Sequence, residues 1–128
     1  MTNSDEQQIR DLLATYQKSL NTSDAELAAS LYTDDGVFMP HSFPTSRKAE
    51  VRGAYGMIFD AIRLDIDFTI DEIVVDGDHG YGLTRSQGTQ TVLATDDTTP
   101  EANRELFVFA RQDGEWKIAR YMFNKTSG

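Results

Sequence analysis

Two side chains in this sequence have the chemistry to move or hold a proton, and they lie far apart along the chain. His41 directly follows Pro40, and the histidine imidazole titrates near neutral pH, which suits general acid–base catalysis. Tyr16 carries a phenol that can hydrogen-bond to a substrate oxygen. Each has an ordinary alternative, because His41 is followed by polar loop residues and a tyrosine on an apolar helix face usually belongs to the core.

Arg85 and Gln87 are a second pair of polar candidates, on one face of a strand predicted over residues 81–93. If that face lines an interior, Arg85 is a buried cation and needs a carboxylate from the protein or from a ligand. If the face points outward, both side chains belong to solvent or to a subunit interface. The sequence leaves both placements open.

The acidic and histidine residues match no metal-binding motif. Asp76, Asp78 and His79 lie in a glycine-rich turn, but their spacing differs from that of a calcium-binding loop. The chain has two histidines, far apart, and no cysteine, which excludes the usual zinc motifs. There is no phosphate-binding loop or nucleophile elbow. We therefore expect no metal and no cofactor.

The first third of the chain predicts two helices that would position Tyr16. Apolar residues recur at helical spacing over residues 5–20, and Ser4 can cap the N-terminus. A second helix is predicted over residues 24–33, where Ser23 and Glu26 form a capping-box pattern. Because both helices and their connection are short, we expect them to pack as neighbours.

Asp35-Gly36 predicts the hinge from the second helix into a short strand, because glycine ends helices in the left-handed conformation at little steric cost. The strand is predicted over residues 37–39, so His41 would lie at the junction of helix and sheet. A third helix is predicted over residues 54–62, with Gly53 at or just before its N-cap.

The second half of the chain predicts consecutive strands joined by turns. An acidic loop with Pro100 is predicted over residues 95–103, and its acidic side chains are expected to face solvent. Helices followed by antiparallel strands indicate an α+β fold, with three helices on one face of a curved sheet and a cavity between the layers. The predicted strands are residues 64–70, 73–75 after a bulge, 81–93, 105–111 and 116–123.

Length and charge limit the class of protein. The 128 residues predict a single domain, 1–128, with its core over residues 8–124. The formal net charge of −9 disfavours nucleic acid and anionic membranes as partners. The first six residues lack the pattern of a signal peptide, and no apolar run is long enough to span a bilayer. We therefore expect a soluble, cytoplasmic protein.

Two stretches resemble one superfamily. Residues 31–40, LYTDDGVFMP, resemble the helix-to-strand junction of nuclear-transport-factor-2-like proteins, which include ketosteroid isomerase and the SnoaL-like and SgcJ/EcaC groups. Residues 105–124 resemble the terminal hairpin of the last two groups. The resemblance covers residues 8–124. It implies a cone-shaped, curved antiparallel sheet wrapped around three N-terminal helices, with a pocket in the cone and a homodimer through the outer sheet face.

The resemblance does not extend to the isomerase mechanism. Ketosteroid isomerase uses a carboxylate base and an oxyanion hole made of a tyrosine and a protonated aspartic acid. Tyr16 matches the position of that tyrosine, but Pro40 stands where the base is expected and cannot take a proton. The acid partner is expected near Leu106 or Phe107. Glu105 could replace it only if the strand register is shifted.

The resemblance also implies an apolar pocket, lined by aromatic residues from several elements. Our first hypothesis is a protein that binds a hydrophobic or aromatic small molecule, with proton transfer through Tyr16 and His41 as a further step. Whether a reaction is catalysed stays open. The candidate ligand-binding residues are Phe38, Tyr55, Phe59, Arg85, Phe107, Phe109 and Tyr121.

Two alternatives remain open. The missing isomerase carboxylates favour a non-catalytic, dimeric binding or accessory module. An epoxide hydrolase of the limonene type requires an Asp-Arg-Asp group around a water molecule, and Arg85 could supply the arginine. That alternative would gain support if Asp60 or Asp67 lay within hydrogen-bonding reach of Arg85.

Overall fold

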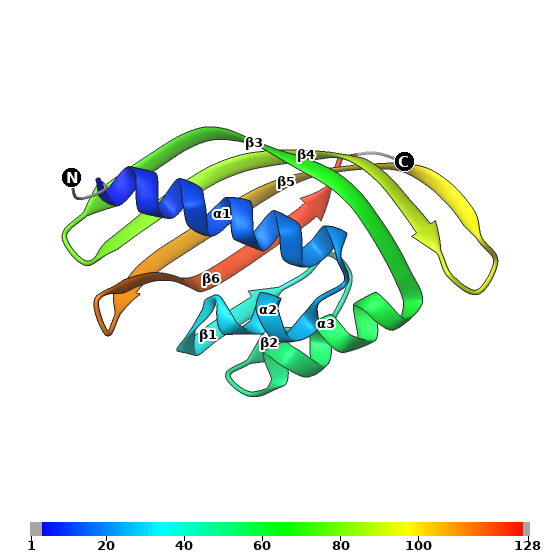
Figure 1. Ribbon diagram of the computed structural model, residues 1–128, viewed down its shortest axis with the longest axis horizontal. Coiled ribbons are helices and arrows are strands. Elements are labelled where there is room, and N and C mark those ends of the chain that lie inside the picture. Colours follow the sequence, from blue (N-terminus) through cyan, green and yellow to red (C-terminus); the bar gives the residue numbers. More distant parts are fainter. Residues whose placement is uncertain (1–3, 127–128) are drawn as a thin grey trace.

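Three long strands arch over the three helices (Figure 1) in the computed structural model, which describes residues 4–126. The predicted α+β class is confirmed. Residues 1–3, which carry part of the argument against a signal peptide, lie outside the described residues. The elements are α1 (Asp5–Asn21), α2 (Ala25–Ser30), β1 (Tyr32–Met39), β2 (Ser46–Arg47), α3 (Glu50–Ala61), β3 (Ile62–Asp76), β4 (His79–Val92), β5 (Asp97–Gln112) and β6 (Glu115–Lys125).

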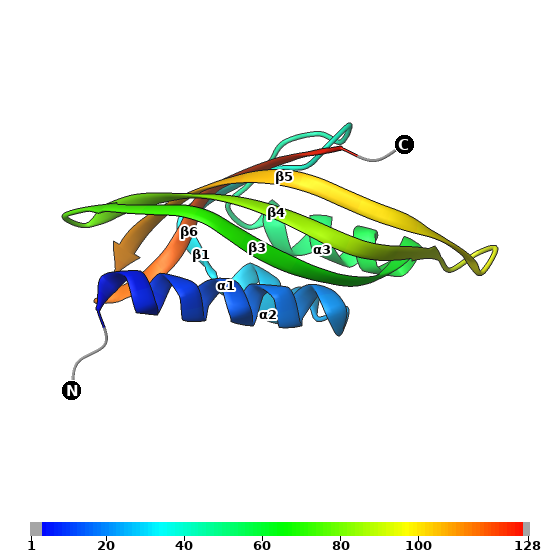
Figure 2. The same ribbon diagram turned by 90° about the horizontal axis from the view of Figure 1, so that it is seen from above.

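The strands form one curved sheet of six, in the order β2-β1-β6-β5-β4-β3. β1 runs parallel to β6, and the other neighbours are antiparallel. Figure 2 shows the length of β3, β4 and β5 from above. The predicted bulge in β3 is confirmed, because its register with β4 shifts between Ile70 and Glu72. At Gly88 the backbones of β4 and β3 approach each other closely, since a Cβ on this residue would lie 2.0 Å from the Asp65 carbonyl oxygen.

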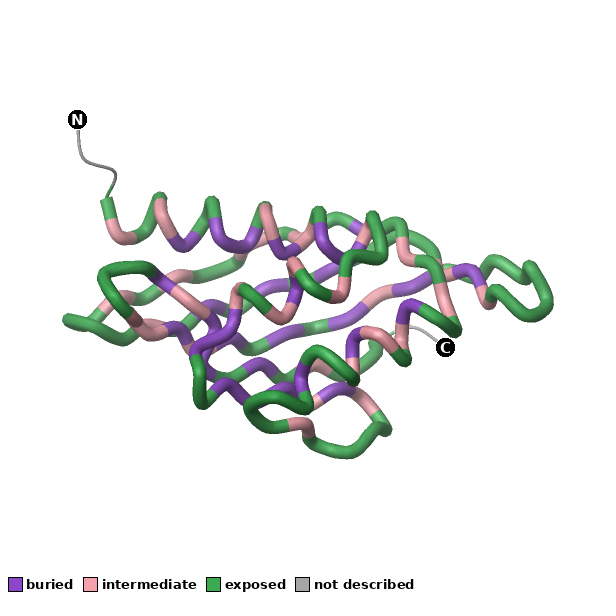
Figure 3. Tube along the Cα trace, turned by 60° about the horizontal axis from the view of Figure 1, so that its bottom comes forward, coloured by how far each residue is buried: buried purple, intermediate pink, exposed green. Residues whose placement is uncertain are grey.

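Helix α1 is amphipathic as predicted, and its apolar side packs on the sheet. Ser4 caps it by accepting a hydrogen bond from the Gln7 amide at 3.1 Å. Figure 3 shows the buried positions of α1 on the side that faces the sheet. Asn21 exchanges two hydrogen bonds with the backbone of Ile66 at the outer edge of β3, at 2.8 and 2.9 Å. These bonds satisfy backbone groups of an edge strand and fix the position of α1.

Helix α2 is shorter than the predicted range, 24–33. It ends at Ser30, and its cap is Asp24, whose Oδ1 accepts from the Leu27 amide at 3.0 Å. The capping-box prediction with Ser23 is therefore wrong by one residue. β1 begins two residues after the end of α2, and its first two side chains are buried. These buried residues continue the apolar spacing of α2 in the sequence, although they belong to a strand.

The hinge predicted at Asp35-Gly36 is also wrong. Both residues lie inside β1, at an irregularity in its pairing with β6 between Tyr32 and Val37. A Cβ on Gly36 would lie 2.9 Å from the Cβ of Tyr32. Glycine is therefore required by a close approach of the chain to a side chain, and the left-handed conformation plays no part.

Two other predicted boundaries change. Helix α3 begins at Glu50, so Gly53 lies inside it. The acidic loop predicted over residues 95–103 is mostly strand, because β5 begins at Asp97 and pairs with β4 along this whole stretch. A proline is tolerated at position 100 because β6 ends opposite Asn103, which leaves this part of β5 with one neighbour.

A stack of aromatic rings joins the sheet to α3. Phe107, Tyr121 and Phe38 are direct neighbours across β5, β6 and β1. Their rings stack with those of Phe109 and Tyr55, with centroids 4.2 to 5.7 Å apart and planes within 10° of parallel. The predicted aromatic interior is confirmed, since all of its members belong to or pack against the core: Phe38, Tyr55, Phe59, Phe68, Phe107, Phe109, Tyr121 and Phe123.

Candidate functional site

A cavity of about 870 Å³ lies between the sheet and the helices, and its wall is mainly apolar. This size is within the range of small-molecule sites. Residues from α1, α3, all six strands and the loop after β1 form its wall. Five of the residues predicted from the sequence line it: Tyr16, Phe38, His41, Tyr55 and Tyr121.

The other predicted residues lie elsewhere. Phe59, Phe107 and Phe109 are buried in the core behind the cavity wall. Arg85 points away from the cavity, and 61% of its side chain is exposed. It donates two hydrogen bonds of 2.9 Å to the carboxylate of Asp71, which lower the pKa of that carboxyl. The prediction of Arg85 as a ligand-binding residue is therefore wrong.

The same placement contradicts the epoxide-hydrolase alternative. Arg85 pairs with Asp71 on the outer face of the sheet. Asp67 accepts a hydrogen bond from Gln17 at 3.0 Å, on the side of α1. The arginine that this mechanism needs is thus outside the cavity.

Three buried tyrosine hydroxyls meet at one end of the cavity. The hydroxyl of Tyr55 lies 2.6 Å from that of Tyr16 and 2.6 Å from that of Tyr32. These side chains come from α3, α1 and β1, and burial raises the pKa of each, so all three are neutral donors. Tyr121 is buried beside them and also interacts with the Tyr16 hydroxyl, so it belongs to the same cluster.

Glu105 is a buried acidic group of the cavity. It is 4% exposed, and its two oxygens accept hydrogen bonds from Thr84 Oγ1 at 2.6 Å and Ser86 Oγ at 2.5 Å. Burial raises the pKa of Glu105, and these hydroxyl bonds offset only part of that shift. Within the described part of the chain, no cation lies at ion-pair distance from it. Its charge raises the pKa of Tyr16 further.

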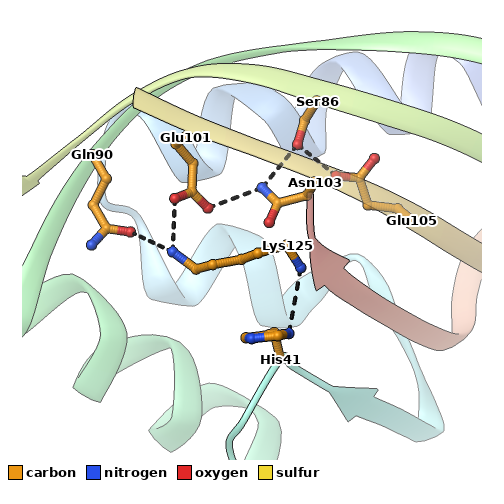
Figure 4. A network of polar contacts seen from close by, with 7 residues as sticks. All are labelled: His41, Ser86, Gln90, Glu101, Asn103, Glu105 and Lys125. Carbon is orange, nitrogen blue, oxygen red and sulfur yellow. Dashed lines mark hydrogen bonds and ion pairs between the residues drawn. The ribbon is translucent and has the colours of Figure 1, made fainter. Parts of the chain in front are cut away.

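Glu105 belongs to a connected set of polar side chains that we call the polar wall (Figure 4). Lys125 Nζ donates to Glu101 Oε1 at 2.8 Å, and Asn103 Nδ2 donates to Glu101 Oε2 at 3.0 Å. Asn103 Nδ2 also donates to Ser86 Oγ at 3.1 Å, which continues the network to Glu105. The polar wall consists of Ser86, Gln90, Glu101, Asn103, Glu105 and Lys125.

His41 lies in the loop after β1, beside this network (Figure 4). Its Nδ1 accepts a long hydrogen bond, 3.4 Å, from the backbone amide of Lys125. Tyr16 is held instead by Tyr55. His41 and Tyr16 therefore share a cavity but belong to separate hydrogen-bond networks.

Sequence reasoning missed most of the polar wall. Glu101 was expected on a solvated face, but it is 6% exposed and paired with Lys125. The available signal was strand alternation, because Glu101, Asn103 and Glu105 have the same parity as the buried Phe107. Pro100 and the acidic composition concealed that pattern.

Among the described residues, no cluster of three or more acidic or histidine side chains is placed to hold a metal ion. In the same residues, no helix is both long and apolar enough to cross a bilayer. The polar groups of the cavity are instead suited to hydrogen bonding and proton transfer with an organic ligand.

The fold and its cavity define the class of this protein. A curved, unclosed sheet covering helices is the arrangement of cystatin-like and nuclear-transport-factor-2-like folds, and two solved structures described in these terms match it over 100% and 97% of the chain. Their TM-scores are 0.77 and 0.74. The profile of the SnoaL-like domain matches residues 1–122. The chain belongs to the SnoaL-like domain family.

Solved structures agree with that assignment. A ketosteroid isomerase-like protein from Erwinia carotovora atroseptica is 30% identical, with a TM-score of 0.93 over 99% of this chain and 100% of that chain. A conserved protein from Planctomyces limnophilus is 24% identical, with a TM-score of 0.83 over 94% and 97%. A type 2 hexachlorocyclohexane dehydrochlorinase is 14% identical and shares the fold, with a TM-score of 0.81 over 95% and 85%. A search of curated proteins found no match.

Proposed function

We propose that the cavity binds a hydrophobic small molecule and that Glu105 moves a proton on it. The observation that supports this most is the state of Glu105, a buried carboxyl with a raised pKa and two hydroxyl donors in a mainly apolar cavity. A carboxylate with a raised pKa is a stronger base than an ordinary carboxylate, and it can return the proton that it takes. In this proposal Glu105 is the carboxylate base, which Pro40 cannot be because proline cannot take a proton.

Tyr16 completes the proposed reaction. Glu105 as carboxylate takes a proton from a carbon next to a carbonyl group, and the electron pair of the broken C–H bond moves to the carbonyl oxygen. Tyr16 donates a hydrogen bond to that oxygen, supported by Tyr55 and Tyr32. The proton then returns from Glu105 to carbon. His41 serves at the edge of the cavity, where it affects entry or release.

The fold neighbours are compatible with this chemistry. Proteins of this fold include one described as ketosteroid isomerase-like and one described as a dehydrochlorinase. Moving a double bond next to a ketone and eliminating hydrogen chloride both require removal of a proton from carbon. The residues that support the proposal for this chain are its own, above all Glu105.

Exchange of carbon-bound hydrogen in deuterium oxide tests the proposal. The probe is 2-tetralone, an aromatic ketone with exchangeable C–H bonds, and the exchange is followed by proton NMR. The wild-type protein is expected to accelerate exchange above buffer and free carboxylate controls. Glu105→Gln should lower the enzymatic rate roughly 10²- to 10⁴-fold, because the amide cannot take the proton. Glu72→Gln, the same change at an exposed position, should have no effect.

The outcome of the exchange experiment distinguishes a catalytic from a non-catalytic protein. Acceleration that survives Glu105→Gln would contradict the role of Glu105. Binding of 2-tetralone without acceleration would favour the non-catalytic binding module instead. Native mass spectrometry of protein purified from its own host would show a bound ligand directly, and failure of the cavity to hold any hydrophobic molecule would contradict the whole proposal.

We also propose that two copies pair through the outer face of the sheet. Leu83, Leu106 and Met122 are direct neighbours across β4, β5 and β6, and they are 41%, 37% and 47% exposed. Tyr81 and Val74 extend this apolar row. A continuous apolar strip on a sheet face is typical of a subunit interface.

A further inference from the structure

Asn103 has an amide oxygen without a partner in a buried position of the polar wall. The residue is 6% exposed and lines the cavity. Its Nδ2 donates to Glu101 Oε2 at 3.0 Å and to Ser86 Oγ at 3.1 Å. Among the described residues no group donates to its Oδ1. Figure 4 shows this oxygen turned away from Ser86.

The orientation of the amide is fixed by its neighbours. Ser86 gives its own proton to Glu105 at 2.5 Å, so its oxygen is an acceptor toward Asn103. Glu101 also presents an oxygen there. If the amide were rotated by 180°, Oδ1 would face two acceptors, one of them on a carboxyl group, and this arrangement is unfavourable.

The unpartnered oxygen is buried and belongs to a side chain that lines the cavity. A buried acceptor without a hydrogen bond is destabilising, so a donor that reaches it gains a bond that the protein itself does not supply. Glu101 and Glu105 lie two residues away on either side, on the same face of β5. Glu101 is paired with Lys125, but among the described residues no cation lies at ion-pair distance from Glu105. The space beside Glu105 is therefore unfavourable for an anion or for a ligand end that only accepts hydrogen bonds.

We propose that Asn103 selects ligands that combine an apolar body with an O–H or N–H donor, and that the donor binds to its Oδ1. This selection rests on the proposed function, because it assumes that the cavity holds a small molecule. It adds to the proposed function the kind of polar group that the ligand carries. The apolar body lies against the aromatic side of the cavity, and the donor completes the polar wall.

Matched probe pairs test this selection by equilibrium dialysis. 2-Naphthol and 2-methylnaphthalene differ by a hydroxyl in place of a methyl group, and indole and 1-methylindole differ by an N–H in place of N–CH₃. Within each pair, selectivity is the dissociation constant of the methyl probe divided by that of the donor probe. The first pair tests an O–H donor and the second an N–H donor.

Asn103→Leu removes the acceptor at similar volume. Selectivity for the donor probe should fall about tenfold in at least one pair, which corresponds to one net hydrogen bond. Asn124→Leu is the matched control, because Asn124 is exposed and accepts from Arg104 away from the cavity. It should leave both selectivities within about twofold of wild type.

A fall of less than twofold in both pairs would overturn the selection by Asn103 and leave the proposed function intact, provided that the probes bind. If none of the four probes binds the wild-type protein, the proposed function fails and the selection fails with it. A crystal structure of the wild-type protein with 2-naphthol gives an answer that does not depend on the variant folding. The hydroxyl is expected within about 3.2 Å of Asn103 Oδ1, and a hydroxyl bound elsewhere would overturn the proposal.

Discussion

At the scale of single residues, Glu105 ties the stability of the protein to pH. Its pKa in the folded protein is raised above its ordinary value of 4.5, chiefly by burial. A carboxyl group of this kind favours folding most while it is protonated, below its unfolded pKa. That contribution is lost as the pH rises through the folded pKa.

The first prediction concerns the variant Glu105→Gln, which cannot ionise. We expect its free energy of unfolding, relative to wild type, to increase as the pH rises from about 4 to about 7, since only the wild-type protein loses the contribution of a protonated Glu105 over this range. Urea titrations at several pH values measure the difference. A difference that stays constant, or that moves in the opposite direction, would show that the pKa of Glu105 is not raised.

The second prediction concerns the tyrosine cluster. Tyr55→Phe removes the central hydroxyl and both hydrogen bonds, to Tyr16 and Tyr32. Because the two remaining hydroxyls are buried, we expect a loss of about 2 to 3 kcal/mol in the free energy of unfolding. Tyr81→Phe, at an exposed tyrosine, should change it by less than about 0.5 kcal/mol. Equal effects of the two variants would contradict the buried network.

Residue types alone identified part of the cavity wall. Tyr16, His41 and Tyr55 were found because they are polar or aromatic residues on predicted elements. Asn103 was not found, because nothing local distinguishes a buried asparagine from one in an acidic loop. Its position depends on long-range pairing of β5 with β4 and β6, which a single sequence does not encode in a short window.

At the scale of elements, β1 shows where local patterns gave the wrong answer. Its first residues continue the apolar spacing of α2, which predicted a longer helix. Parallel pairing of Tyr32 with Ile118 of β6 and the hydrogen bond between the hydroxyls of Tyr32 and Tyr55 favour the extended chain instead. Tertiary contacts therefore overrode helical periodicity.

The third prediction tests that correction with two glycines. Gly36→Ala places a Cβ 2.9 Å from Tyr32 and should lower the free energy of unfolding by about 2 kcal/mol, since β1 must shift. Gly53→Ala introduces a Cβ with no atom within 4 Å, inside α3, and should raise it by about 0.5 to 1 kcal/mol. Thermal or urea unfolding measures both. A neutral Gly36→Ala would contradict the close approach in β1.

Other elements were predictable because their signals are local. α1 has a capping serine and a clear apolar stripe. The last hairpin was predicted around residues 112–115, and its turn has positive φ at Asp113 and Gly114, which Asp-Gly commonly adopts in two-residue hairpin turns. The long alternating strand that became β3 was also found, together with its bulge.

At the scale of the whole molecule, the proposed dimer separates the two faces of the sheet by function. The inner face forms the cavity, and the outer face carries the row of Leu83, Leu106 and Met122. A single domain over residues 1–128 and a cytoplasmic location stay predictions.

The fourth prediction is that Leu106→Glu separates the dimer into monomers, because a charge in the centre of an apolar interface is costly to bury. Light scattering after size exclusion should give twice the 14.4 kDa of one chain for the wild type and 14.4 kDa for the variant. Leu93→Glu, at an exposed leucine outside the row, should stay dimeric. A monomeric wild type, or a dimeric Leu106→Glu, would contradict the proposal.

The chain has one tryptophan, and its position away from the cavity has an optical consequence. Trp116 donates to Asp5 of α1 at 3.2 Å, and the Arg111 guanidinium lies 4.8 Å from the centre of its ring. Its emission should therefore follow the detachment of α1 from the sheet. Tyr16, Tyr55 and Tyr121 face the cavity, so near-ultraviolet circular dichroism of tyrosine should follow its occupancy. Unfolding and ligand entry can thus be recorded separately in the unlabelled protein.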